Sequence, residues 1–75
     1  MICELTELSK NEEAVIVDLN CDDQTKQRFL ELGFLPGTKI SLECTTPFGG
    51  PVTCSIRDAK IALRRKEATA IHVQK

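Results

Sequence analysis

The sequence predicts a small, mainly β protein: a partly open barrel of five short strands, with one short amphipathic helix inserted after the first strand. Three observations support this fold class. The chain has 75 residues, which is enough for one domain and no more. Apolar and β-branched residues alternate with polar ones over short segments that turn-forming residues separate. Only one segment has the composition of an amphipathic helix longer than a single turn.

The first third of the chain predicts a helical turn, a second turn and a strand. Leu5 and Leu8 are three residues apart, so a single helical turn would direct both toward the core. Residues 9–12 form a polar turn in which Asn11 tolerates a left-handed backbone. Residues 13–19 are rich in β-branched side chains and predict the first strand, although its continuous apolar centre leaves the register open.

Residues 24–32 contain good helix formers, and the acids just before them can cap a helix. Gly33 suits the left-handed position that ends a helix. This ending pairs Phe29 with Phe34 in an apolar contact. Pro36–Gly37 then suits the centre of a type II turn.

Residues 39–45 and 52–57 alternate clearly and predict a hairpin about the loop 47–51. Folding this hairpin about Gly49 would pair Cys44 with Cys54. The side chains expected to face inward are Ile40, Leu42, Cys44, Val52, Cys54 and Ile56.

The rest of the chain predicts two further strands, residues 60–64 and 70–73, separated by a helical turn at 65–68. Their alternation directs Ile71 and Val73 inward and His72 outward.

Composition and motifs exclude most classes of chemistry. Ten Lys and Arg against eleven Asp and Glu give a formal net charge of −1, which does not indicate a nucleic-acid binder. No apolar run approaches the ~20 residues that cross a bilayer, and the N-terminus lacks the pattern of a secretory leader. We therefore expect a cytoplasmic protein that inserts into no membrane and binds no nucleic acid.

The chain shows no nucleophile–base pair, no paired catalytic carboxylates and no phosphate-binding loop. We expect no enzyme activity, no catalytic residues and no cofactor. The four cysteines lack any closely spaced ligand pair, so we expect no metal site and buried or incidental thiols, with a metal or a disulfide as the less favoured alternatives.

Protein–protein docking is the remaining class of function. A short helix and its exit cannot direct every large apolar side chain inward, because adjacent helix positions diverge by about 100°. Some of these side chains should stay at the surface and bind a partner, unless they only cover the ends of the barrel. The candidate partner-binding residues are Phe29, Leu30, Phe34, Leu35 and, at the hairpin tip, Phe48.

Three motifs, Leu-Gly-Phe-Leu-Pro-Gly at 32–37, Pro-Phe-Gly-Gly-Pro at 47–51 and Ile-Ala-Leu-Arg-Arg-Lys-Glu-Ala at 61–68, closely resemble the FeoA family along the whole chain. Asn11 and Asp58 replace glycines common in that family, and both residue types tolerate left-handed backbone.

This resemblance implies an SH3-like barrel that assists the ferrous iron transporter FeoB by docking on its cytosolic part, with oligomeric state left open. Two alternatives remain: the SH3-like domain of iron-dependent repressors, which should follow a DNA-binding segment that this chain lacks before Met1, and a cysteine-based iron or zinc chaperone.

Overall fold

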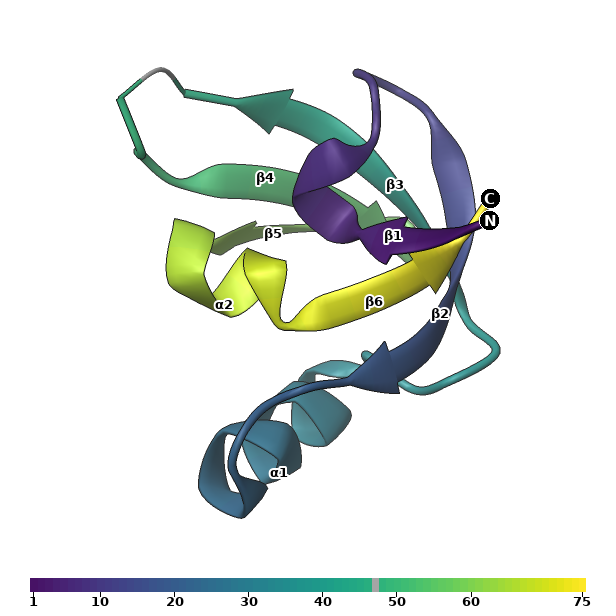
Figure 1. The fold of residues 1–75 in the computed structure, drawn as a ribbon, viewed down its shortest axis with the longest axis vertical. Coiled ribbons are helices and arrows are strands. Elements are labelled where there is room, and N and C mark those ends of the chain that lie inside the picture. The colour runs from purple at the N-terminus through teal and green to yellow at the C-terminus, as the bar shows by residue number, and fades with distance from the viewer. Residues whose placement is uncertain (47) are drawn as a thin grey trace.

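The computed structural model describes residues 1–46 and 48–75, and the predicted turn at Pro47 lies outside the described residues. A strongly curved sheet forms the body of the protein, and one helix stands at its lower edge in the view of Figure 1. In chain order the elements are β1 (Ile2–Glu4), a 3-10 turn (Leu5–Glu7), β2 (Glu13–Leu19), α1 (Asp23–Leu32), β3 (Lys39–Thr45), β4 (Val52–Ile56), β5 (Ala59–Leu63), α2 (Arg65–Thr69) and β6 (Ile71–Gln74).

The described strands form one antiparallel sheet in the order β1-β6-β2-β3-β4-β5. The sequence prediction of five strands was therefore wrong by one strand, and α1 follows the second strand rather than the first. The missed strand is β1, which has three residues and no alternation long enough to recognise. It is held in place by pairing with β6, from Ile2 opposite Gln74 to Glu4 opposite His72.

Strands β1 and β5 lie at the two ends of this order, and each pairs with one neighbour among the described residues. The sheet and the short helix α1 confirm the mainly β class. Among the described strands, β1 and β5 do not pair with each other, so closure into a barrel is not shown. The core is one cluster of buried hydrophobic residues. Its largest fully buried side chains are Phe29, Phe34, Leu5, Ile16, Ile40, Leu63, Ile71, Val52, Val73 and Cys54.

One predicted core residue, Cys44, is exposed, because a β-bulge in β3 changes the register of the hairpin. Leu42 lies opposite Cys54, but the next pair joins Cys44 to Thr53, so Glu43 is the extra residue. A bulge rotates every later side chain of the strand to the other face. The other five inward positions in β3 and β4 are buried, as predicted.

Two tight turns depend on left-handed backbone at residues other than glycine. Asn11 has φ 65°, as the sequence predicted. The β4–β5 connection has two residues, Arg57 at φ 50° and Asp58 at φ 66°, between the paired Ile56 and Ala59. Positive φ at both central positions is the geometry of a type I′ hairpin turn.

Candidate docking surface

A cap at each end fixes where α1 begins and where it ends. Asp22 precedes the first turn, and its carboxylate accepts a hydrogen bond from the Thr25 backbone N–H at 2.7 Å. Hydrogen bonding from Thr25 also lowers the pKa of the Asp22 carboxyl. Gly33 ends the helix at φ 102°, and its N–H donates to the Leu30 carbonyl at 3.1 Å. The chain therefore leaves α1 in one fixed direction.

The two phenylalanines at this exit form the anchor of α1. The Phe34 N–H donates to the Phe29 carbonyl at 3.0 Å, which brings the two side chains together across the cap. Their ring centroids lie 5.5 Å apart at an interplanar angle of 66°, an edge-to-face contact. Both side chains are completely buried. Phe29 and Phe34 are therefore two candidate docking residues that expose no surface in this structure.

The leucines at the same exit are distributed differently. Leu30 is half-buried and packs against the core, whereas Leu35 is 39% exposed. Leu32, which the candidate set omitted, is 43% exposed. Leu32 lies three residues after the buried Phe29, which alone would place it on the same side of the helix. It is also the last residue before the Gly33 cap, where the helix ends, and this position was the signal for its exposure. We call these three residues, Leu30, Leu32 and Leu35, the helix-exit patch.

The turn after α1 fixes the helix-exit patch to the sheet. The Thr38 N–H donates to the Leu35 carbonyl at 3.1 Å across Pro36–Gly37, and Gly37 has φ 90°. These values confirm the predicted type II turn. Two backbone hydrogen bonds then join this turn to Ile16 of β2, at 2.7 and 2.9 Å. Leu32 and Leu35 are exposed at this exit, where a partner protein can contact them.

Phe48 is a second apolar feature, in the loop between β3 and β4. Its side chain is fully exposed and its φ is 61°. The base of the loop is held by two hydrogen bonds from Thr46 to the Pro51 carbonyl, at 3.3 Å from N–H and 3.1 Å from Oγ1. The Arg65 guanidinium of α2 donates to the Thr46 carbonyl at 3.2 Å. A fixed base therefore presents an exposed aromatic side chain.

A hollow of about 560 Å³ lies between the start of α1 and α2. It is polar and open to solvent, and a 2.8 Å ion pair between Arg28 and Glu67 joins the two helices. Cys21 lines it. Burial first, and then the negative charge of Asp22, raise the pKa of the Cys21 thiol. The Cys21 thiol is therefore harder to ionise than a free cysteine thiol, and the thiolate is the form that acts as a nucleophile and metal ligand.

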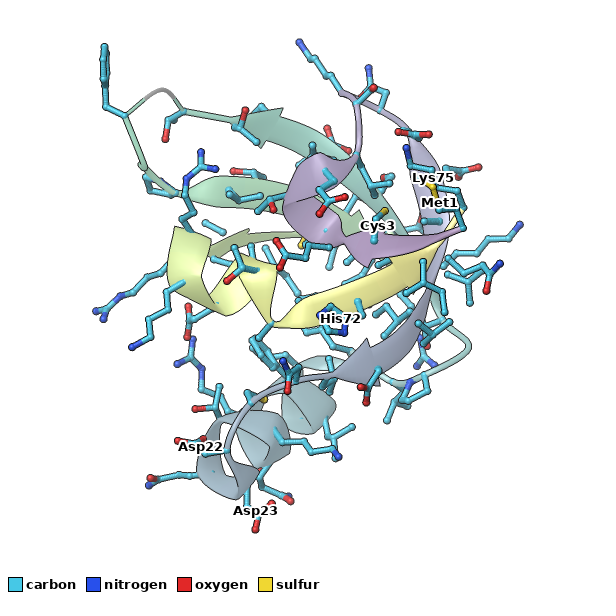
Figure 2. All side chains as sticks on the ribbon, in the orientation of Figure 1. Met1, Cys3, Asp22, Asp23, His72 and Lys75 are labelled. Carbon is cyan, nitrogen blue, oxygen red and sulfur yellow. The ribbon has the colours of Figure 1, made fainter. Side chains whose placement is uncertain are left out.

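The cysteines lie in different parts of the fold. Cys3 and Cys54 are buried, Cys21 is half-buried, Cys44 is exposed, and all four are free thiols. Cys3 and His72 belong to adjacent strands, β1 and β6, near the termini (Figure 2). Within residues 1–46 and 48–75, no three His, Cys, Asp or Glu side chains are grouped so as to hold a metal ion. No described helix is long and apolar enough to cross a membrane.

Comparison with known proteins identifies the class of domain that this fold and surface represent. Residues 3–75 match the model of the FeoA domain. A curated relative, the Fe(2+) transport protein A/Fe(2+) transporter FeoB fusion protein of Porphyromonas gingivalis (strain ATCC BAA-308 / W83), is 36% identical over 70 residues. That match covers 93% of this chain and 8% of the relative, so the chain spans a small part of the relative's length.

The chain belongs to the FeoA domain family, whose members are non-catalytic accessory domains. A solved iron(II) transport protein A from Clostridium thermocellum is 31% identical, with a TM-score of 0.86 over 95% of this chain and 44% of that one. A crystal structure of the iron uptake regulatory protein FeoA has a TM-score of 0.89 at 22% identity, covering 99% of this chain and 97% of that one.

The same fold occurs in a manganese-dependent transcriptional repressor. Its TM-score is 0.89 at 19% identity, over 99% of this chain and 41% of that one. Identity this low shows a shared fold and nothing about the function of this chain.

Proposed function

We propose that this chain is an accessory domain of ferrous iron uptake that docks on the cytosolic part of a FeoB-type transporter. The observation that carries the proposal is the curated relative, in which an FeoA domain and FeoB are parts of one polypeptide. Joining two domains in one chain raises the effective concentration of each for the other, which favours even a weak contact.

The surface supports a protein partner of this kind. Leu32 and Leu35 are apolar and exposed beside the hydrogen-bonded Gly33 cap and turn, and Phe48 is apolar and exposed in a loop whose base is hydrogen-bonded. Side chains held in place lose little conformational freedom on binding, and large apolar side chains supply most of the binding free energy at interface centres. We therefore place the contact with the transporter at the helix-exit patch, with the Phe48 loop as a second contact.

The test is binding of the purified chain to the separately purified cytosolic part of the cognate transporter, measured by calorimetry without lipid. We expect Leu35→Ser or Phe48→Ser to raise the Kd about tenfold or more, as loss of an interface anchor does. Ile2→Ser is the matched control, because Ile2 is also apolar and 61% exposed but lies on β1, outside the helix-exit patch and the Phe48 loop. It should leave the Kd unchanged.

Folding of each variant is checked by its amide NMR spectrum. If Leu35→Ser and Phe48→Ser both keep the native spectrum and bind like the unmodified chain, the proposed contact surface is wrong. If the unmodified chain itself fails to bind, docking on the transporter is wrong.

A further inference from the structure

Charge is strongly segregated along this chain, although the total is close to zero. Residues 44–66 contain five of the ten Lys and Arg side chains, but Asp58 is their only acidic residue. The other ten acidic side chains and the remaining five basic ones lie outside this segment. One part of the molecule is therefore positive and the remainder is negative.

The fold gathers the positive segment on the β4–β5 hairpin and the start of α2. Ser55 is paired with Lys60 and Thr53 with Ala62, so these four side chains share the outer face of the hairpin. All four are exposed or half-exposed, whereas Cys54 and Leu63, which alternate with them, are buried. Five cations lie on this face or at its two ends, and we call it the basic hairpin face: Arg57, Lys60, Arg64, Arg65 and Lys66.

This face belongs to the edge of the sheet. Among the described strands, β5 pairs only with β4, and four of its five residues are exposed or half-exposed. The cations at the two ends of β5 are separated by about 17 Å, the length of a five-residue strand. Between them lie small side chains and no aromatic residue. The face thus presents exposed small side chains between its cations.

The carboxylates near these cations lie at the two ends of the face, and none lines a hollow with Lys60 among the described residues. Asp58 lies in the hairpin turn beside Arg57. Glu67 of α2 forms an ion pair with Arg28 and accepts a hydrogen bond from the Arg64 backbone N–H. At the other end of the face, Arg64 and Lys66 line the hollow between α1 and α2 together with Glu4, Asp22 and Glu67, and the charge of Lys66 helps to lower the pKa of the Asp22 carboxyl. Figure 2 shows Asp22 and Asp23 at the start of α1, at the opposite edge of the molecule from the β3–β4 loop.

We propose that the basic hairpin face lies against the anionic phospholipid surface of a membrane, without crossing it. Protein interfaces have an apolar, often aromatic centre, and lysine is depleted from them, whereas this face has Lys60 and the small side chains of Thr53, Ser55 and Ala62 at its centre. Clusters of four to eight Lys and Arg side chains beside a membrane-spanning helix or on an amphipathic helix adsorb to anionic headgroups, and the same attraction acts on cations that a hairpin presents. The inference is independent of docking on the transporter, which uses different residues.

Sedimentation with vesicles tests this proposal. At low ionic strength the chain should bind vesicles of equal parts phosphatidylglycerol and phosphatidylcholine, and should not bind phosphatidylcholine alone. The double variant Lys60→Gln/Arg64→Gln should lower the partition coefficient roughly 25-fold, at about fivefold per cation. Added salt should weaken binding of the unmodified chain, because it screens exposed charges.

The matched control is Lys10→Gln/Lys26→Gln, which removes the same net charge from two exposed lysines outside the positive segment. It should retain most of the binding. Equal loss in both double variants, or equal binding to neutral vesicles, would overturn the proposal. A short DNA duplex is titrated in parallel, and binding to it but not to anionic vesicles would assign the face to nucleic acid instead.

Discussion

Cys54 is a buried side chain that makes the stability of the protein depend on pH. It is fully buried on β4, and its thiol donates a long hydrogen bond to the Ile61 carbonyl, with an S···O distance of 3.6 Å. Burial raises the pKa of this thiol from 9.0 to about 11. A group that binds its proton more tightly in the folded state makes the free energy of unfolding depend on pH.

We therefore expect stability to fall as pH rises from about 9 to about 11. In this range the unfolded thiol has lost its proton while the folded one keeps it, so deprotonation favours unfolding by about 2–3 kcal/mol at the upper end. Below pH 9 both states are protonated and this effect vanishes. Urea unfolding at several pH values, compared with Cys54→Ala, isolates the effect. The variant should be less stable at pH 7 but lose less over the alkaline range, and equal losses would contradict the assignment.

The elements show which features the sequence could predict. The end of α1 was predictable because Gly33, Phe29 and Phe34 act through local geometry, which sequence spacing reports directly. The β3 bulge was not, because the alternation in residues 39–45 continues through Glu43 without a local signal. Whether the Cys44 side chain faces the core or the solvent depends on how β3 pairs with β4. Strand β1 was missed for the same reason: its partner, β6, lies at the other end of the chain.

The candidate docking residues divide in the same way. Adjacent helix positions cannot all face inward, and this argument correctly predicted that some large apolar side chains would stay at the surface. It could not tell which ones, because that depends on where the sheet lies relative to α1. Leu32 and Leu35 are exposed, whereas Phe29 and Phe34 are buried. The Gly33 cap and the hydrogen bonds to Ile16 fix the backbone at the helix exit and so determine this distribution.

The β4–β5 turn is an element that a single substitution should stabilise. Asp58 has φ 66°, a conformation that glycine adopts without steric cost. We expect Asp58→Gly to raise the free energy of unfolding by about 0.5–1 kcal/mol. Asp18→Gly is the matched control, since it removes an equally exposed charge from strand β2 and should destabilise by a similar amount. Thermal unfolding measures both, and a lower melting temperature for Asp58→Gly would contradict the expected gain.

At the scale of the whole molecule, stability should be uneven. The strands from β2 to β5 form a continuous hydrogen-bonded ladder, whereas α1 stands beside it (Figure 1) and contributes Phe29 as its only fully buried residue. The Arg28–Glu67 ion pair adds little, because the Arg28 side chain is 58% exposed.

We expect the amides of α1 to exchange with solvent through local opening, well before those at the centres of β3 and β4. Elements with few buried contacts open at a lower free energy than the global transition. Native-state hydrogen exchange followed by NMR measures this directly. Equal opening free energies for Phe29 and Leu42 would show instead that α1 unfolds only with the sheet.

The pairing of β1 with β6 has a consequence for how the domain can be carried by larger proteins. It places the two ends of the chain together: the Lys75 N–H donates to the Met1 carbonyl at 3.2 Å, and Figure 2 shows both residues at one corner. Polypeptide attached at either end therefore leaves from the same point. A host protein could therefore carry the domain as an insertion in a surface loop, because the two loop ends need to be only a few ångströms apart. The helix exit and the β4–β5 hairpin would remain free to bind.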